Sequence, residues 1–327
     1  MSSRENPKSI RQHYVSRVLL GRFSKDPTLK NGLVGQFDIV NGTELPARTP
    51  GAIGFERYFV KYDGDRMEAL WGTMETPMRS AFDALLAGRP EMLETKKTQI
   101  MDFIALHFAR SLEAQRIHQE SISEVEARTQ ANKDMQARLA KIKYGFDLSK
   151  APSILDEISE EVLWPIQKLE NQGSLFQEWV ESVFQRTRQH LADYSLSVRP
   201  AEEGGEYLLG DCPAVGVAPG MDPRKRPPLF DAKAIILPLT PNYAVMAYPP
   251  GPGDPAFSVN LPEPGILRAI NHGQIAQAHR RVYYRPDSGH ALTVRNYLGF
   301  PHGRVQRSPR RGAGSVQELG TRLPFSG

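Results

Sequence analysis

The sequence has very little cysteine and no long hydrophobic run. Its single cysteine, Cys212, excludes an internal disulfide framework and a zinc cluster built from cysteines. The longest apolar runs are far shorter than the roughly 18 residues that a membrane-spanning helix needs. The opening residues 1–12 are polar and lack the apolar core of a signal peptide. We therefore expect a soluble, cytoplasmic protein with no membrane partner.

Recognised catalytic and nucleotide-binding motifs are also absent. The chain contains no GxSxG nucleophile turn, Walker A loop, GxGxxG fingerprint, His-Glu-x-x-His zinc motif or EF-hand spacing. The residues alone therefore name no substrate and no cofactor, although a divalent metal is compatible with the carboxylates discussed below.

Positive charge is concentrated at the C-terminal end. The whole chain carries a formal charge of +4, whereas the residues from Arg285 onward contain seven arginines against Asp287 and Glu318, a balance of +5. Residues 1–284 therefore carry about −1, which argues against a nucleic-acid footprint across the body. The tail can contact nucleic acid or phosphate, or can simply be solvated, through Arg304, Arg307, Arg310 and Arg311.

Hydrophobic periodicity predicts an α+β fold, with a mostly helical middle and small antiparallel β elements at the N-terminal side and after residue 204. Alternating residues and an Asn-Gly turn indicate strands near the start, and EYLLGD, AKAIILPL and YAVMAY indicate strands later. Helical spacing is found in five segments, at residues 14–23, 65–88, 98–118, 153–191 and 266–284.

The same patterns predict the domain organisation. Residues 1–10 are expected to be flexible, and residues 11–285 to form a single α+β domain. Within it, residues 119–150 read as a charged helical extension because apolar positions are sparse. No periodicity continues after Arg285, so residues 286–327 are expected to be a basic, disordered tail.

The segment from Thr98 to His118 is the strongest helical signal. Its first three turns are apolar on nearly every side, which predicts a buried helix. His107 and Arg110 lie inside this apolar run, and a buried guanidinium needs an acceptor because an unpaired one costs several kcal/mol. The rest of the fold is therefore expected to bring acceptors to Arg110, with Glu75 and Asp211 as the candidates.

Six segments in a preserved order resemble a known family, the domain of unknown function 4238 family, over roughly residues 11–285. They are His13-Tyr14-Val15 with Leu19, Leu20 and Phe23, then Met74-Glu75, Phe103 to Arg110, GGEYLLGDCP, AIILPLTP and AINHGQIAQAHRRVYY. The resemblance implies a bacterial protein, and the family has no assigned activity.

The chain departs from the family pattern at several positions. Ser16 stands where the opening motif has proline, and Cys212 stands where a later turn has asparagine. Arg110-Ser111-Leu112 replaces an Arg-Thr-Pro sequence, so the central helix is expected to continue past Arg110. Gly21-Arg22-Phe23 replaces an Arg-Asn-Phe sequence. We interpret the chain as a divergent member in which a family activity can be altered.

Polar residues within these segments are the candidate site. We assign catalytic roles to His13, Glu75, Arg110 and Asp211, because a histidine and carboxylates can transfer protons and an arginine can hold a phosphate. Glu75 and Asp211 together can hold a divalent metal. The remaining polar residues of these segments are assigned to ligand binding, and they are Arg17, Asn271 and Arg280.

Structural roles compete with these assignments. Glu75 and Arg110 can form a buried ion pair that fixes helix register, Asp211 can form a local turn, and His107 fits a hydrogen-bonded core histidine. We therefore favour a ligand-binding or regulatory protein with a polar site on the buried helix. The alternative is a hydrolase or nuclease-like phosphoesterase that uses the four catalytic candidates.

Overall fold

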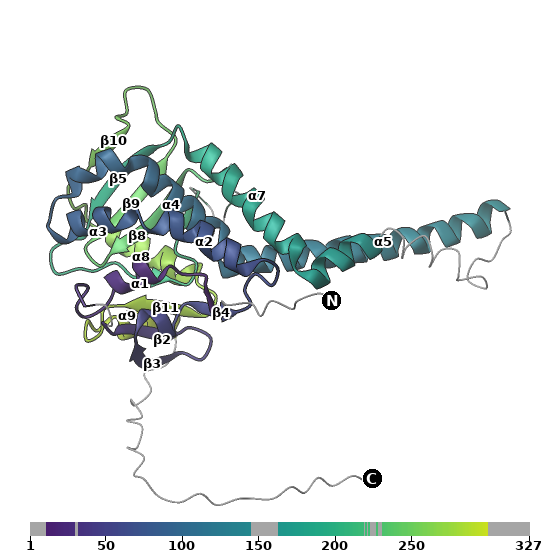
Figure 1. The fold of residues 1–327 in the computed structure, drawn as a ribbon, viewed down its shortest axis with the longest axis horizontal. Helices are drawn as coiled ribbons and strands as arrows, with labels where there is room; N and C mark the ends of the chain where they lie inside the picture. The colour runs from purple at the N-terminus through teal and green to yellow at the C-terminus, as the bar shows by residue number, and fades with distance from the viewer. Residues whose placement is uncertain are drawn as a thin grey trace, which may run out of the picture.

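The computed structural model describes residues 11–299, apart from 30–31, 145–162, 219, 221, 223–226 and 228–230. Helices and strands separate into a helical layer and two main sheets, as Figure 1 shows, so the α+β fold class is confirmed. None of the described helices is both long enough and apolar enough to cross a membrane.

A five-stranded sheet forms the centre of the body. Its centre is the antiparallel hairpin of β8 and β9, which the sequence predicted from two hydrophobic runs joined by Thr240-Pro241-Asn242. All its neighbouring strands pair antiparallel except β10 and β5, which are parallel. The strand order is β10 (Phe257–Val259), β5 (Ser195–Pro200), β9 (Tyr243–Tyr248), β8 (Ala234–Thr240) and β7 (Val215–Val217).

Helices cover one face of this sheet and bury the main core. Side chains such as Ile235, Leu237 and Val245 leave the sheet on this face and are fully buried among helix residues such as Phe103 and Phe82. The covering helices are α1 (Arg17–Arg22), α2 (Gly64–Glu75), α3 (Met78–Leu86), α4 (Lys97–Ala109) and α7 (Ser174–Leu191). A 3-10 turn, η2 (Pro90–Lys96), leads into α4.

The opposite face is covered by α8 (Ile266–Ala276). Ile236 and Met246 point to this face, where they pack with Ile270 of the helix. The sheet is therefore covered on both sides, by a thick helical layer on one and by a single helix on the other.

A four-stranded sheet joins the two ends of the described chain. Its order is β3-β2-β11-β6, so N-terminal β2 pairs with C-terminal β11 over the register Arg281↔Asp38 to Tyr284↔Gly35. A small core under this sheet is closed by the helix α9 (His290–Tyr297). The strands are β2 (Val34–Asp38), β3 (Thr43–Arg48), β6 (Leu209–Gly210) and β11 (Arg281–Tyr284). A separate pair joins β1 (Arg11–His13) to β4 (Phe55–Arg57), and η1 (Pro50–Ala52) lies between these segments.

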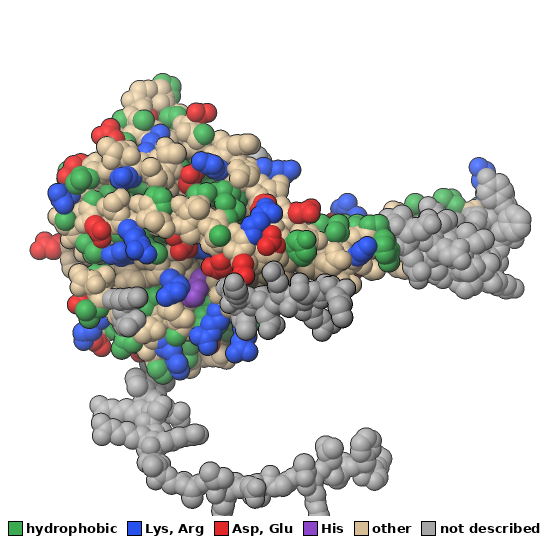
Figure 2. Space-filling view, in the orientation of Figure 1, with side chains coloured by type: hydrophobic (Ala, Val, Ile, Leu, Met, Phe, Trp, Pro, Cys, Tyr) green, Lys and Arg blue, Asp and Glu red, His purple; other side chains and the backbone are tan. Residues whose placement is uncertain are grey.

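The helix α5 (Leu112–Tyr144) projects from the body as an arm (Figure 1). With 33 residues it is about 50 Å long at 1.5 Å per residue. Figure 2 shows hydrophobic side chains at the surface along it. The large hydrophobic residues of α5 that are exposed include Val125, Met135, Leu139 and Ile142. The arm contains residues 119–144 of the predicted charged extension, and residues 145–150 of that prediction lie outside the described part.

Several sequence expectations need correction. The central helix does not continue past Arg110: α4 ends at Ala109 and α5 begins at Leu112. The late helix ends at Ala276, and RVYY forms β11 because its alternating Val282 and Tyr284 fill the core under the sheet. Strand β5 begins at Ser195, before the predicted start of the second β region.

The boundary of the predicted disordered tail was also placed too early, because α9 follows residue 285 and buries Val294. Residues 1–10 and the four tail arginines, Arg304, Arg307, Arg310 and Arg311, lie outside the described residues. The Thr76-Pro77 sequence separates two helices, α2 and α3, rather than kinking one.

Candidate functional site

Arg110 lies at the C-terminal end of α4 with 1% of its side chain exposed. Its Nη2 donates a hydrogen bond to Glu75 Oε1 at 2.6 Å, and its guanidinium lies 4.6 Å from the centre of the Trp71 ring. Trp71 and Glu75 are four residues apart on α2, so one helix face supplies both contacts. Of the two acceptors predicted for Arg110, the structure therefore places Glu75 beside it.

His13 lies next to this ion pair, in β1 rather than in a helical turn. Burial, together with the positive charges of Arg110 and Arg17, lowers its pKa to about 3. The imidazole is therefore neutral at physiological pH, with a lone pair and no charge to attract an anion. It can accept a hydrogen bond from a ligand, but it is too weak a base to take up a proton readily.

Glu68 is a member of this group that the sequence reasoning missed. Burial raises the pKa of its carboxyl group, and the nearby charge of Glu75 raises it too, although Arg110 and the backbone N–H of His13 act in the opposite direction. A signal was available in the spacing, because positions 68, 71 and 75 fall on one face of a helix. Glu68 therefore belongs to the α2 face that contacts Arg110.

Four buried polar atoms in this region have no hydrogen-bond partner among the described residues. They are His13 Nε2, Ser16 Oγ, Glu68 Oε1 and Arg110 Nε. Buried polar groups are nearly always hydrogen-bonded in folded proteins, so a cluster of orphans from three parts of the chain marks a place where water or a ligand completes the bonding. We call His13, Ser16, Glu68, Glu75 and Arg110 the polar cluster.

His107 is a structural residue beside the polar cluster. Its Nδ1 faces the carbonyl of Phe103 at 2.9 Å, and its Nε2 accepts the backbone N–H of Ser16 at 3.3 Å. Burial lowers its pKa to about 3, and Arg110 contributes to the lowering. A neutral ring with hydrogen on Nδ1 satisfies both contacts, so His107 connects α4 to the start of α1.

A cleft of about 720 Å³ adjoins the polar cluster and shares Glu75 with it. The wall has three arginines against one carboxylate, a balance of two positive charges. Arg17 is exposed at the start of α1, while Arg22 lies over the Phe82 ring at 5.0 Å and 3.8 Å from Asp83. The lining residues are Arg17, Val18, Gly21, Arg22, Pro27, Thr28, Leu29, Thr49, Pro50, Gly51, Glu75 and Arg79.

Asp211 is held away from Arg110 by backbone hydrogen bonds, contrary to our expectation that it joins the same site. Its carboxylate accepts the N–H groups of His279 at 2.7 Å, Arg280 at 2.7 Å and Arg281 at 2.9 Å. Burial raises the pKa of Asp211 although these three donors lower it. Sequence reasoning placed Asp211 after a strand correctly, but the backbone that it binds comes from a turn about 70 residues later in the chain.

Asn271 and Arg280 also have structural partners. Asn271 accepts the N–H of Leu208 at 2.8 Å and donates to the carbonyl of Glu206 at 2.9 Å, so it fixes α8 beside β6. The Arg280 guanidinium pairs with Glu56 at 2.5 Å. Of the seven predicted site residues, the structure therefore brings together His13, Arg17, Glu75 and Arg110, and it engages Asp211, Asn271 and Arg280 with other partners.

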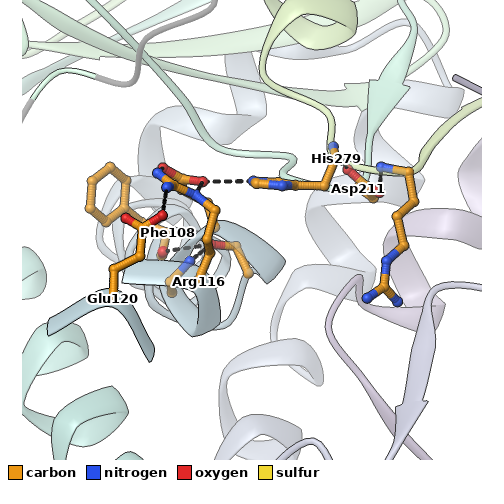
Figure 3. Close-up of polar contacts among 9 residues, drawn as sticks. Phe108, Arg116, Glu120, Asp211 and His279 are labelled. Atoms are coloured by element: carbon orange, nitrogen blue, oxygen red, sulfur yellow. Dashed lines mark hydrogen bonds and ion pairs between the residues drawn. The ribbon is translucent and has the colours of Figure 1, made fainter. Parts of the chain in front are cut away.

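A second network connects the base of the arm to the Asp211 turn (Figure 3). His279 Nε2 lies 2.6 Å from Glu113 Oε2, and Arg116 donates to both oxygens of Glu113 at 2.7 and 2.9 Å. Burial raises the pKa of Glu113, but the bonds from Arg116 and His279 outweigh it and hold that pKa well below its usual range. Arg116 also pairs with Glu120, so the network fixes the direction in which α5 leaves the body.

The expectation of a metal held by Glu75 and Asp211 has no support in the described part of the chain. No group of three or more His, Cys, Asp or Glu side chains there is arranged to hold a metal ion. The carboxylate of Glu75 is bound by Arg110, and that of Asp211 is bound by three N–H groups.

Comparison with known proteins gives one result. The family described as "Protein of unknown function (DUF4238)" matches residues 11–288. No curated protein and no solved structure matches the chain. Since the match covers most of the 327 residues, the chain belongs to this family, and the resemblance seen in its six segments is confirmed.

Proposed function

We propose that this family member binds an anionic ligand that carries a phosphate group, in the cleft beside the polar cluster. The observation that supports the proposal best is the wall of the cleft, in which three guanidinium groups and one carboxylate surround about 720 Å³. Guanidinium groups hold phosphate oxygens through paired hydrogen bonds, and several around one cleft attract an anion from solution.

The ion pairs formed by the residues that line the cleft do not neutralise all of its positive charge, so some of this charge can attract a ligand. Glu75, the one carboxylate of the wall, already accepts a hydrogen bond from Arg110 behind it. Among the described residues, Arg17 and Arg79 form no direct ion pair with a carboxylate, although the charge of Arg17 acts on Glu68, and the Asp83 partner of Arg22 is largely exposed. The Arg22–Asp83 pair is long, at 3.8 Å, and its carboxylate is exposed, so it contributes little and leaves the guanidinium able to attract a ligand anion.

The orphan atoms of the polar cluster give the ligand a second point of contact. The ligand, or a water molecule bound with it, would place a donor against the neutral His13 Nε2 and an acceptor against Arg110 Nε. We therefore expect recognition to depend on a hydroxyl or amide group as well as on phosphate.

A phosphoesterase is the alternative function. The observation that favours it is His13, a neutral imidazole with an unpartnered Nε2 near a cleft that suits phosphate. Against it, Asp211 is engaged elsewhere, so the expected four-residue catalytic group is not assembled.

We also propose that the protein is bacterial and cytoplasmic. Its single cysteine cannot form an internal disulfide, which is consistent with a reducing compartment.

The test is calorimetric titration of the full chain with inorganic pyrophosphate and with adenosine monophosphate. We expect saturable binding that weakens with added salt. Replacing Arg17 or Arg79 by glutamine should weaken it at least about tenfold, because a charge-assisted hydrogen bond is lost. The matched control is Arg128→Gln on the exposed arm, where Arg128 pairs with its neighbour Glu124.

Three outcomes separate the alternatives. Binding that Arg17→Gln and Arg79→Gln reduce but Arg128→Gln does not supports the cleft. Binding that none of the three changes, or no binding, rejects it. Release of phosphate from either probe by the wild-type chain, lost in His13→Gln, would favour the phosphoesterase.

A further inference from the structure

We infer that the space between α8 and the five-stranded sheet is a second ligand site, for a small apolar carboxylate. It is a cavity of about 250 Å³ on the face of the sheet opposite the helical layer. It shares no lining residue with the basic cleft. The cavity, its apolar lining and one arginine at its edge support the inference.

The sheet side of the cavity follows from strand register. Val215 pairs with Ile236, and Ile236 pairs with Met246, so these three side chains form one row across β7, β8 and β9. All three line the cavity together with Val217. A row of apolar side chains on one face is the expected result of cross-strand pairing, and here the row packs against Ile270 of α8 in one part and borders the cavity in another.

The helix side of the cavity follows from small residues at the inner face of α8. The lining positions 266, 269, 270, 273 and 274 have the spacing of one helix stripe. Ala269 and Gly273 are the small residues of this stripe. A Cβ at Gly273 would lie 3.3 Å from Val215, so the helix approaches β7 closely there, and the side-chain volume that would fill the cavity is missing at Ala269. The space is therefore built into the sequence of α8.

Arg199 gives the cavity its chemical preference. It is the one charged residue in a wall that is otherwise apolar except for Gln274, and Gln274 is bound to Gly210 N and Pro213 O. The Arg199 Nε is buried and has no hydrogen-bond partner among the described residues. Its Nη1 lies 3.5 Å from Glu263, a side chain that is 61% exposed, and such a pair contributes little.

These features point to an anionic head group with a short apolar tail. A carboxylate at Arg199 would accept the hydrogen bond that Nε does not make, and paired hydrogen bonds between arginine and carboxylate are strong. An apolar cavity of about 150 Å³ is known to hold a benzene ring. The larger volume here suits a medium-length acyl chain or a ring with a short side chain.

The experiment titrates the full chain with octanoate, with 3-phenylpropanoate and with 1-octanol, using calorimetry. We expect saturable binding of at least one carboxylate, at least about tenfold tighter than that of octanol, since only the carboxylate can pair with Arg199. Preference for octanoate or for phenylpropanoate identifies a chain or a ring as the natural tail.

Three variants test whether the carboxylates and octanol bind in this cavity. Arg199→Gln should weaken carboxylate binding at least about tenfold and leave octanol binding unchanged. Ala269→Leu should fill the space and abolish binding of all three probes. Glu263→Gln should strengthen carboxylate binding, because it removes the competing acceptor. Circular dichroism melting of each variant establishes that the fold is intact.

The inference is overturned if neither carboxylate binds the wild-type chain, or if Ala269→Leu binds them as well as wild type does. It is also overturned if Arg199→Gln and wild type bind octanoate equally. Failure here leaves the basic cleft untouched, because pyrophosphate binding and octanoate binding depend on different residues.

Discussion

Arg110 has the most demanding environment of any residue in the described chain that we assign to the site. It is almost fully buried, lies over Trp71 and makes one strong hydrogen bond, while its Nε has no partner among the described residues. A guanidinium in this position stabilises the fold only while Glu75 remains beside it, because each charge alone would be buried without compensation. Arg110 is not among the residues that line the cleft, and its link to the cleft is Glu75, which accepts its hydrogen bond and lines the wall.

Replacing Arg110 separates its structural role from its binding role. Arg110→Ala leaves Glu75 unpaired and removes the stack on Trp71, so we expect a loss of about 3–5 kcal/mol in the free energy of unfolding. Arg110→Lys keeps the charge but lacks the planar fork, and it should remain folded with weakened pyrophosphate binding. Urea unfolding and calorimetry measure the two effects. Equal unfolding by both variants would show that Arg110 serves only the fold.

The loss of fold stability in acid is a second property that individual residues determine. Burial lowers the pKa of His13 and of His107 from 6.5 to about 3. As pH falls below about 6.5, the unfolded chain binds a proton at each ring while the folded chain does not. Stability is therefore lost between these pH values, at up to about 1.4 kcal/mol per pH unit for each histidine. The raised pKa values of Glu68 and Asp211 act with the opposite sign.

A difference between two variants isolates the histidine contribution. His107→Gln can still accept from the Ser16 N–H and donate to the Phe103 carbonyl, but it cannot titrate. As the pH is lowered, the unfolding free energy of this variant should fall less steeply than that of wild type. The two slopes should differ by up to about 1.4 kcal/mol per pH unit. Urea titrations between about pH 4 and 7 give both slopes. Parallel slopes would mean that His107 is not protonated on unfolding in this range.

At the scale of elements, the junction of α4 and α5 decides where the arm begins. Arg110 has left the helical region, with φ −95° and ψ 63°, because its side chain is held against α2. Ser111 then caps the next helix, accepting the N–H of Ala114 on its Oγ at 3.2 Å. The break therefore occurs without the proline that the family pattern has at this place.

The cap can be tested directly. Ser111→Ala should destabilise the chain by about 0.5–2 kcal/mol, because the Ala114 N–H loses its acceptor in a buried site. Ser121→Ala is the control, since Ser121 is exposed in the middle of α5 and bonds only the carbonyl one turn earlier. Its effect should stay within about 0.5 kcal/mol. If the two variants unfold at the same urea concentration, the Ser111 cap does not stabilise the chain.

At the scale of the whole molecule, the two candidate sites are separate. The basic cleft is formed by α1, residues 27–29, η1, the end of α2 and the start of α3, whereas the apolar cavity is formed by α8 and the other face of the five-stranded sheet. They share no residue, and the main core lies between the helical layer and that sheet. Neither ligand is expected to move an element that the other one contacts.

Independence of the two sites is therefore a prediction. The dissociation constant of pyrophosphate should change by less than about twofold when octanoate is saturating, which corresponds to a coupling energy near zero. Calorimetric titration of each ligand with and without the other measures the coupling in both directions. A larger change, equal in the two directions, would show that the sheet transmits a conformational change between them.

The sequence by itself determined the class of fold, the position of the buried helix and the family. It also indicated the polar residues near Arg110, because buried apolar periodicity makes a charged position conspicuous. These are local signals, carried by spacing within one helix or one strand.

The tertiary structure alone decided which polar residues meet. Asp211 looked like a partner of Arg110, yet its oxygens bind backbone N–H groups far along the chain. It also decided that RVYY is a strand, since β2 supplies the hydrogen bonds that an isolated segment lacks. Contacts between distant segments depend on how whole layers pack, and no spacing along the chain records that arrangement.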